Sequence, residues 1–528
     1  MSKIYEKNEE LQDKIYKGVE KLTDIVSSTL GPKGRNVILR RKNKNPIITK
    51  DGVTIAKFID FSDPIEDTAA QIIKQASSKT ADDAGDGTTT STVLAHAMYS
   101  YARRYIKSGV SVSEIKKGME SAYEDIVSYL EQAAIPVKSI EDVKHVATIS
   151  ANGDNSVGEI ISAAVDKVGA DGVINIEDGK SSKTILDVVE GFNFDSGYAA
   201  SAFITDENRK SVKYNDCLFF ITDHKLDSVE RVLPVLELAA RNDRPLVIIA
   251  EEIEGQLLAA LIMNTIRGSM KIVAIKSPYY GQQRRDFLVD ASNITGAKLV
   301  LRDAGNDFSE FKLNDFGRSE KVEVRKNRTT IVGGKSDYEK VDSTIQNLKD
   351  AMKEVDLGNA HEGLAECSKI QERINRLSSG VAVIKVGGNT EIEAIEKRHR
   401  VEDALEAVMA AKISGIHLGG GMALVKAHKN IKRRKLLGDE KLGYDVVFEA
   451  IKSPIKQIAK NAGESPDLIL SKALGLKGNK GIDMSTGKAV DMLEKGIVDP
   501  VLVTCSALKN AVSVVSLLVS TNNAVVEK

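Results

Sequence analysis

The chain has 528 residues with a formal net charge of −1, and 28% of its residues are charged. Because acidic and basic residues nearly cancel, the composition argues against the strong positive field of nucleic-acid-binding or membrane-surface proteins. A chain of this length exceeds what one hydrophobic core usually supports, so about three domains are expected. The three cysteines, Cys217, Cys367 and Cys505, lie too far apart for a short-spaced metal motif and fit a reducing compartment.

The N-terminal part predicts mainly helices. Apolar residues recur at spacings of three and four over 9–30, which predicts an amphipathic helix that Gly31-Pro32 ends. Short strand-like runs follow at 36–39 and 46–49, and further helices are expected over 65–81, 88–108 and 112–133. Apolar residues are otherwise scattered, so neither a signal peptide nor a membrane helix is expected. Ile135-Pro136 is the first candidate domain boundary.

One stretch of this part, Asp86 to Thr90, has the composition of an anion site at the start of a helix. Gly85 and Gly87 flank a carboxylate, and a run of threonines leads into an apolar helical pattern. The amides and dipole of such a helix start favour phosphate. Asp86 would repel bare phosphate, so a bridging divalent cation, most plausibly Mg²⁺, is expected. A threonine or aspartate cap on a surface helix is the alternative.

The centre of the chain alternates strands and helices. Buried-strand patterns lie at 217–221, 246–250 and 271–275, and helical patterns at 226–241, 254–268 and 283–294. This alternation predicts an α/β domain, with a boundary near the Gly/aromatic segment 191–198. A charged helical stretch is expected around 336–378 and a buried strand at 380–387. Helices at 391–413 and 422–436 flank Gly419-Gly-Gly421, and the remainder returns to long helices.

Several separate glycine- and carboxylate-bearing segments together resemble one protein family. The segments are Leu30-Gly-Pro-Lys-Gly-Arg-Asn-Val37, Gly85 to Thr90, Leu233-Pro-Val-Leu-Glu237, Asn264-Thr-Ile-Arg-Gly268, Arg400-Val-Glu-Asp-Ala-Leu405, Gly419 to Gly421 and Asp499-Pro500. In this order and spacing, from about residue 4 to 520, they resemble the bacterial-type (group I) 60 kDa chaperonins, the GroEL family.

The resemblance implies a multidomain α and α/β fold with three domains. A helical equatorial domain that binds ATP would comprise 1–134 and 414–528. A small α/β intermediate hinge domain would comprise 135–189 and 381–413. An α/β apical domain that binds clients would comprise 190–380.

The resemblance also implies the site residues. Asp403 and Asp51 would be catalytic, with Asp403 orienting or deprotonating the attacking water, and Asp86 would hold Mg²⁺. The alternative for Asp403 is a salt-bridged helix carboxylate beside Arg400. K⁺ is a further candidate cofactor. The residues implied to contact ATP are Thr29, Leu30, Gly31, Pro32, Lys50, Asp51, Gly52, Asp86, Gly87, Thr88, Thr89, Thr90, Gly420, Asp483, Met484 and Asp499. Asp483-Met484 stands where the family usually has Asn-Ala.

An apolar groove for unfolded chains is implied on two central helices. Its residues would be Tyr198, Phe203, Leu233, Leu236, Leu258, Ile262 and Met263. Without the resemblance, helix residues with this spacing would be interpreted as core. Ala202 replaces the first member of an aromatic pair that the family usually carries.

The implied function is an ATP-dependent folding chaperone in a cytoplasmic homo-oligomeric ring, which the resemblance implies is heptameric. Its partners would be unfolded polypeptides and a GroES-like co-chaperonin, with no nucleic acid and no membrane. A holding protein without ATP turnover is the alternative, and the intact set of Asp51, Asp86 and Asp403 favours turnover. An independent metabolic ATPase or kinase is disfavoured because no acceptor pocket is indicated.

The contact between rings is expected to differ from the family norm. Lys456 preserves the charge of a basic residue that family members use between rings, but Ser465 stands where the acidic partner is expected. The loss repeats at every subunit of a symmetric ring, although Glu464 is a neighbouring candidate to restore the pairing.

Overall fold

The computed structural model describes residues 3–40, 46–151, 153–168, 173–179, 181–207, 209–303, 308–335, 338–354, 367, 369–371, 373–374, 376–377 and 380–527. The chain forms two compact units. Unit 1 comprises Met1–Ala163, Asp178–Ile185 and Lys385–Lys528, and unit 2 comprises Ala164–Glu177 and Leu186–Ile384. Unit 1 therefore contains both predicted equatorial segments and most of the predicted intermediate segments, and the division into three domains stays a prediction.

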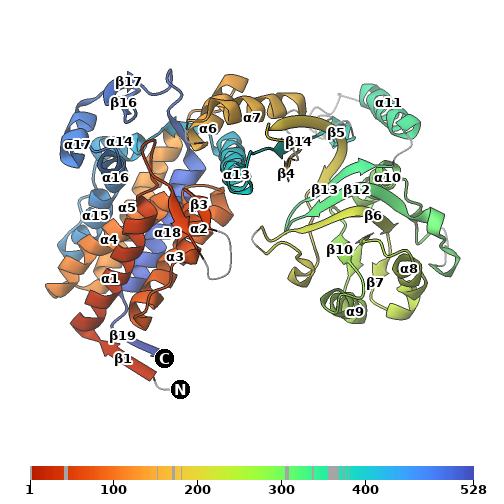
Figure 1. Cartoon of the computed structure of the whole chain (residues 1–528), viewed down its shortest axis with the longest axis horizontal. Helices are drawn as coiled ribbons and strands as arrows, with labels where there is room; N and C mark the ends of the chain where they lie inside the picture. Colours follow the sequence, from red (N-terminus) through yellow and green to blue (C-terminus); the bar gives the residue numbers. More distant parts are fainter. Residues whose placement is uncertain are drawn as a thin grey trace. The chain divides into compact units, whose positions relative to one another are not determined.

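Unit 1 is mainly helical (Figure 1). Its helices in the first part of the chain are α1 (Asn8–Ser27), α2 (Gly52–Phe58), α3 (Pro64–Ala84), α4 (Thr88–Lys107), α5 (Val112–Gln132) and α6 (Ile140–Ser150), and α7 (Asn155–Val168) continues into unit 2. Its later helices are α13 (Glu391–Ser414), α14 (Met422–Asn430), α15 (Gly438–Ala450), α16 (Ser453–Asn461), α17 (Pro466–Gly475) and α18 (Val501–Val519).

The central helix of unit 1 is α18, which packs against α3, α4 and α5 (Figure 1). By length and composition alone it could cross a membrane, but 72% of its most apolar window is buried inside the structure. Its apolar residues join the core formed by the buried faces of α1, α3, α4, α5 and α15. The hydrophobicity of α18 is therefore explained by its place in the core.

The described part of unit 1 also contains four antiparallel strand pairs. They are β1 (Lys3–Lys7) with β19 (Asn523–Glu527), β2 (Val37–Leu39) with β3 (Ile47–Thr49), β15 (Ile416–Leu418) with β18 (Val498–Pro500), and β16 (Lys480–Asp483) with β17 (Lys488–Asp491). The β1–β19 pair joins the two ends of the chain. The β15–β18 pair places the Gly419–Gly421 loop beside Val498 and Asp499.

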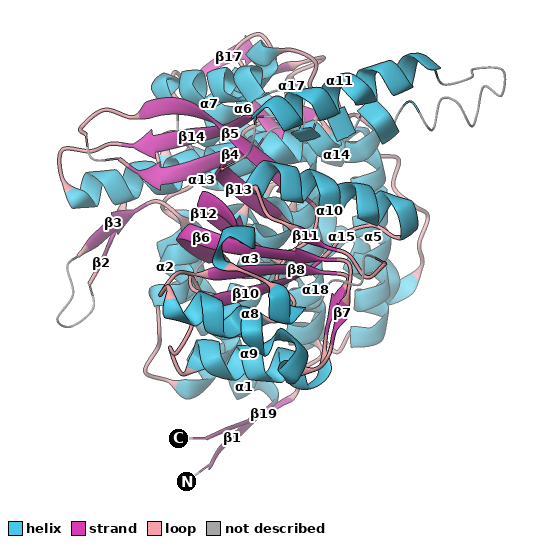
Figure 2. Ribbon diagram, turned by 90° about the vertical axis from the view of Figure 1, so that its right-hand side faces the viewer, coloured by secondary structure: helices cyan, strands magenta, loops and turns pink. Residues whose placement is uncertain are grey.

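Unit 2 is built on a mixed sheet of nine described strands, most of them drawn in magenta at the centre of Figure 2. The order is β10-β8-β6-β12-β13-β5-β14-β4, with β11 beside β6. Its strands are β4 (Val173–Asp178), β5 (Ile185–Phe194), β6 (Val212–Thr222), β8 (Leu246–Ala250), β10 (Ile272–Lys276), β11 (Leu299–Val300), β12 (Gly317–Val324), β13 (Thr329–Gly334) and β14 (Gly380–Val386). The chain passes between the two units within β4, β5 and β14.

The parallel strands β6, β8 and β10 are connected through helices, as the sequence predicts. The remaining elements among the described residues are β7 (Lys225–Leu226), β9 (Glu252–Ile253), α8 (Val229–Arg241), α9 (Gly255–Ile266), α10 (Gly281–Thr295), α11 (Tyr338–Glu354) and three short 3₁₀ turns, Ser201–Phe203, Phe308–Glu310 and Leu313–Asp315. The apolar residues of β6, β8 and β10 are almost all fully buried, which is why they form continuous hydrophobic runs in the sequence.

Most predicted elements are confirmed, and the differences have local causes. The antiparallel strands β12 and β13 were not predicted, because charged and glycine residues interrupt their apolar pattern. The helix expected over 422–436 ends at Asn430. Beyond it, Arg433 pairs with Asp445 and Arg434 with Asp125, so these arginines satisfy carboxylates of the same chain. Of the helix expected around 336–378, much lies outside the described residues.

Candidate nucleotide-binding site

The start of α2 is held by Asp51. Its carboxylate caps the helix by accepting hydrogen bonds from the amides of Val53 at 3.0 Å and Thr54 at 2.9 Å. It also accepts one from the hydroxyl of Thr54 at 2.5 Å. Asp51 follows the buried end of β3, where its own amide donates to the Thr49 hydroxyl at 3.0 Å. These contacts fix the position of the Asp51 carboxylate and its negative charge.

The start of α4 lies against the start of α2. Gly87 is the N-cap of α4, with φ at +86°, and no side chain caps the helix. A Cβ atom on Gly52 would lie 2.5 Å from Oγ1 of Thr89 and 2.8 Å from Oγ1 of Thr88. Only glycine therefore allows this approach, which brings together the first turns of two helices and two threonine hydroxyls. Free first-turn amides at such a place are suited to bind phosphate.

A third helix start, that of α14, lies at the same site. Gly421, with φ at +77°, is its N-cap, again without a side-chain cap. Gly420 also has positive φ, and nothing lies within 4 Å of where its Cβ would be. Its amide donates to the carboxylate of Asp499. The open space beside Gly420 is what a close-lying ligand requires.

Three aspartates of this site, Asp51, Asp86 and Asp499, are linked electrostatically. Asp86 accepts hydrogen bonds from the amide of Gly87 at 2.5 Å and the hydroxyl of Ser150 at 3.1 Å. Burial, and then the charge of Asp51, raise the pKa of Asp86 above its ordinary value. Burial, and then the charge of Asp86, raise the pKa of Asp499 to about 6. Burial and the neighbouring carboxylates therefore both disfavour the ionised forms of Asp86 and Asp499.

Asp403, on α13, belongs to the same electrostatic group. Burial, followed by the charges of Asp51, Asp86 and Glu406, raises its pKa well above the ordinary value. The alternative that Asp403 pairs with Arg400 is not supported, because Arg400 instead pairs with Glu396 and with Asp154 at 3.0 Å. The structure thus brings Asp403 to the carboxylates at the starts of α2 and α4, although it is more than 300 positions away in the sequence.

This arrangement suits a divalent cation that arrives with phosphate. The carboxylates of Asp51, Asp86, Asp403 and Asp499 supply hard oxygen donors and excess negative charge. Within the described part of the chain, no group of three or more His, Cys, Asp or Glu residues is placed to hold a metal by itself. Mg²⁺ commonly takes one or two carboxylates and completes its shell with phosphate and water, so the two observations agree.

The remaining predicted nucleotide contacts differ in what they offer. Thr29 donates its hydroxyl to the carbonyl of Val26 at 2.8 Å, so its donor is already used. Asn461 holds the following loop by donating to the carbonyl of Leu30 at 2.9 Å. Pro32 is exposed, Gly31 has φ at +85° and Lys50 is half-buried. Burial, and then the nearby Arg400, lower the pKa of Lys50.

The interpretation of Asp483 and Met484 as base contacts needs correction for Met484. Its side chain is 6% exposed and packs in an apolar cluster with Met422 and Ile455. Asp483 closes the turn between β16 and β17 by accepting hydrogen bonds from the amide of Ser485 and the hydroxyl of Thr486, both at 2.8 Å. Any contact of Met484 with a base would therefore have to come from its backbone.

The residues expected in the client groove of unit 2 divide into two sets. Leu233 and Met263 are 45% and 47% exposed, and Tyr198, Leu258 and Ile262 are half-buried. Phe203 and Leu236, at 0% and 6%, are wrong as surface contacts, because both belong to the core of unit 2. Ile266, which the sequence analysis missed, is 66% exposed on α9 and extends the apolar surface.

Sequence reasoning also missed Ser150 and Glu406. Ser150 ends α6 and carries no recognisable motif, so only the fold brings it to Asp86. The sequence could have indicated Glu406, because it lies three positions after Asp403 and therefore on the same side of the helix. A Cβ atom on Gly85 would lie 2.3 Å from Cβ of Glu406, so glycine at 85 lets α13 approach the loop that carries Asp86.

A family model described as the TCP-1/cpn60 chaperonin family matches residues 22–528. The chain belongs to this family. Its fold is similar to that of the chaperonin gp146 from bacteriophage EL 2 (Pseudomonas aeruginosa), crystallised in the presence of ATP-BeFx. One crystal form aligns with a TM-score of 0.68 and 20% sequence identity, and covers 99% of each chain. A second crystal form of the same chaperonin aligns with a TM-score of 0.62, also at 20% identity and with 99% of each chain covered.

Membership in the chaperonin family agrees with the multidomain helical and α/β fold. It also gives the elements at the starts of α2, α4 and α14 a common interpretation, as parts of one nucleotide site. The identities of the individual contacts stay predictions.

The raised pKa of Asp499 predicts a pH effect on stability. Its folded-state value of about 6 exceeds the ordinary 3.8, so its contribution to stability is full below pH 3.8 and is lost as pH rises through about 6. We expect Asp499→Asn, without nucleotide or Mg²⁺, to melt a few degrees above the native protein at pH 7.5, and the gap to shrink at pH 5. Differential scanning fluorimetry measures both, and a gap independent of pH would contradict the assignment.

Proposed function

We propose that this chaperonin hydrolyses ATP at the site described above and couples the cycle to the folding of unfolded polypeptides in a homo-oligomeric ring. The observation that supports the proposal best is the gathering of Asp403 with Asp51 and Asp86 at two helix starts with open first turns. Clustered carboxylates and unpaired first-turn amides are unfavourable without a ligand. A magnesium-bound phosphate would compensate both, because the metal binds carboxylates and the phosphate accepts from the amides.

Each residue has a role that follows from its contacts. The first-turn amides and hydroxyls of Thr88, Thr89 and Thr90 would bind the phosphates. Asp86, held by Gly87 and Ser150, would hold Mg²⁺, which when bound neutralises phosphate charge. Asp51 accepts three hydrogen bonds, so it acts best as a fixed charge that orients its neighbours.

Asp403 is suited to accept a proton. The carboxylate has a raised pKa and pairs with neither Arg400 nor another described cation, so it would orient the attacking water and take its proton. α13 carries it to the phosphates, so movement of α13 would connect hydrolysis to the rest of the chain.

The chaperonin named above was crystallised with an ATP analogue, which supports nucleotide binding by this chain. We further propose Mg²⁺ and K⁺ as cofactors, a heptameric ring, a GroES-like partner and a cytoplasmic location, all of which rest on the family resemblance alone.

The test of the proposal is refolding of a chemically denatured client by the purified protein. ATP with Mg²⁺ should raise the yield of active client and release phosphate, whereas a non-hydrolysable analogue should not raise the yield. Capture of the client with no phosphate release and no gain in yield would instead support the holding protein.

We expect the client surface to include Leu233. Because this side chain is 45% exposed, Leu233→Ser should weaken capture of unfolded protein, by at most about 3 kcal/mol, without unfolding unit 2. Capture is measured by co-sedimentation of a denatured client, and folding by circular dichroism. Leu437→Ser is the matched control, since Leu437 is 87% exposed in unit 1. Unfolding of unit 2 by Leu233→Ser, or equal loss of capture with Leu437→Ser, would contradict the assignment.

We also expect a weak contact between rings. Lys456 pairs with Asp467 of its own chain at 2.7 Å, so its charge is already compensated, and Ser465 offers no carboxylate. An exposed pair contributes about 0–1 kcal/mol, but a ring repeats the effect in every subunit. Mass photometry, with and without ATP, should show single rings in at least one state. Stable double rings in every condition, even at low protein concentration, would refute this expectation.

A further inference from the structure

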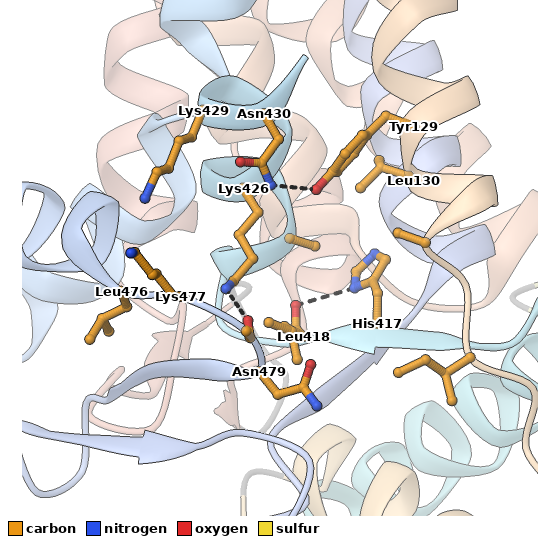
Figure 3. A pocket seen from close by; sticks show the side chains of 14 residues that line it. Tyr129, Leu130, His417, Leu418, Lys426, Lys429, Asn430, Leu476, Lys477 and Asn479 are labelled. Carbon is orange, nitrogen blue, oxygen red and sulfur yellow. Dashed lines mark hydrogen bonds between the residues drawn. The ribbon is translucent and has the colours of Figure 1, made fainter.

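A cavity separate from the nucleotide site lies in unit 1 (Figure 3). It has a volume of about 500 Å³ and lies between the end of α5, strand β15, helix α14 and the turn that precedes β16. None of the residues predicted to contact the nucleotide lines it. Its size is in the range of small-molecule sites, about 300–1,000 Å³.

The base of the cavity carries an unsatisfied hydrogen-bonding group. His417 is 4% exposed, and its Nδ1 lies 3.2 Å from the carbonyl oxygen of Leu418. A carbonyl can only accept, so Nδ1 carries the proton, and in the neutral ring Nε2 is an acceptor. Nε2 is buried and has no hydrogen-bond partner. Burial lowers the pKa of His417 to about 4, which keeps the ring neutral at pH 7.

The rim of the cavity is positively charged. Lys426, Lys429 and Lys477 line it, and none of the described residues that line it is an aspartate or glutamate. Lys426 donates to the carbonyl of Gly478, and Lys429 donates to the carbonyl of Leu474 at 2.6 Å. An ammonium group has three donors, so each of these two lysines keeps donors for another acceptor. Figure 3 shows both lysines extending from α14 on the left of the view, with His417 to their right.

The surface between rim and base is largely apolar. Leu130, Leu418 and Ala423 are buried beside His417, and Leu476 lies nearer the rim. The cavity thus has a polar base, an apolar middle and a positively charged opening. A ligand that fits it carries a hydrogen-bond donor, an apolar body and a negative charge in the same order.

We propose that this cavity binds a small organic anion whose carboxylate lies at the lysine rim, whose apolar body contacts Leu130 and Leu418, and whose hydroxyl or N–H group donates to Nε2 of His417. A hydroxylated aromatic carboxylate has this order of groups. Binding would satisfy the buried acceptor and neutralise part of the positive rim.

The position of the cavity connects it to the nucleotide loop. His417 is the middle residue of β15 and lies directly opposite Asp499 in the β15–β18 pair, and Gly419–Gly421 follows β15. A ligand on His417 would therefore change the affinity for nucleotide, and the nucleotide would change the affinity for the ligand by the same factor. This coupling rests on the proposed function, whereas binding to the cavity does not.

The test is calorimetric titration of the full-length protein with 4-hydroxybenzoate, benzoate, 4-methylphenol and inorganic phosphate, without nucleotide. We expect one 4-hydroxybenzoate per chain, and binding about tenfold weaker for benzoate, which lacks the donor, and for 4-methylphenol, which lacks the charge. Equal binding of phosphate would mean that the lysine rim acts alone, and would overturn the proposal. So would the absence of 4-hydroxybenzoate binding at millimolar concentration.

Variants assign the binding to this cavity. His417→Leu should remove the preference for 4-hydroxybenzoate over benzoate. Lys429→Met should weaken the binding of 4-hydroxybenzoate and of benzoate equally. Because Lys429 is exposed, this variant keeps the test valid if His417→Leu does not fold. Lys472→Met, an exposed lysine outside the cavity, is the matched control and should change nothing. Unchanged binding in both cavity variants would overturn the proposal.

Discussion

Replacing Asp403 with alanine should leave ATP binding close to native and slow hydrolysis by about 10²–10⁴-fold, the usual effect of removing a general base. The carboxylate lies in the field of Asp51 and Asp86 but contributes none of the amides or hydroxyls at the helix starts. Its loss therefore removes orientation and proton transfer rather than phosphate contacts. Phosphate release measures turnover, and calorimetry with ATP measures binding.

The matched control is Glu402→Ala, one position away on α13. Glu402 pairs with Arg398 at 3.0 Å, so this change removes a carboxylate of the same helix outside the group described above. It should leave hydrolysis within about twofold of native, as expected when an i,i+4 helix pair worth about 0.3–0.5 kcal/mol is lost. Native turnover in Asp403→Ala would remove Asp403 from the mechanism, and loss of ATP affinity would instead make it a binding residue.

Replacing Asp86 with lysine should abolish binding of Mg-ATP. The change removes an oxygen ligand and places an ammonium where the cation would lie, next to the hydroxyl of Ser150. Two like charges at such a site cost about 3 kcal/mol or more, roughly a 10²-fold or greater loss of affinity. Calorimetry with Mg-ATP measures the affinity, and circular dichroism checks that the variant folds.

The control for this variant is Asp83→Lys. It makes the same change of charge near the exposed end of α3, where Asp83 pairs with Lys79. We expect it to keep most of the affinity, because the lost pair is a surface pair. Unchanged affinity in Asp86→Lys would show that Asp86 does not hold the metal. An equal loss in both variants would show that the total charge, rather than the position of Asp86, controls binding.

Local chemistry in the sequence was sufficient to predict the parts of the proposed nucleotide site. Glycines such as Gly87 and Gly421, a hydroxyl run at a predicted helix start and periodic apolar residues are each recognisable within a few positions of the sequence. The order of these segments was enough to indicate the family. The alternation of strands and helices likewise predicted the α/β unit, because a parallel pair such as β6 and β8 requires a connection long enough for a helix.

The tertiary structure alone decided which residues are buried and which charges meet. Leu233 and Leu236 lie on one helix three positions apart, yet only Leu236 belongs to the core, because burial depends on what packs against each side of α8. Met484 is buried for the same reason. Asp86, Ser150 and Asp403 come from three helices, and their contacts are set by packing over long sequence separations, which no local pattern records.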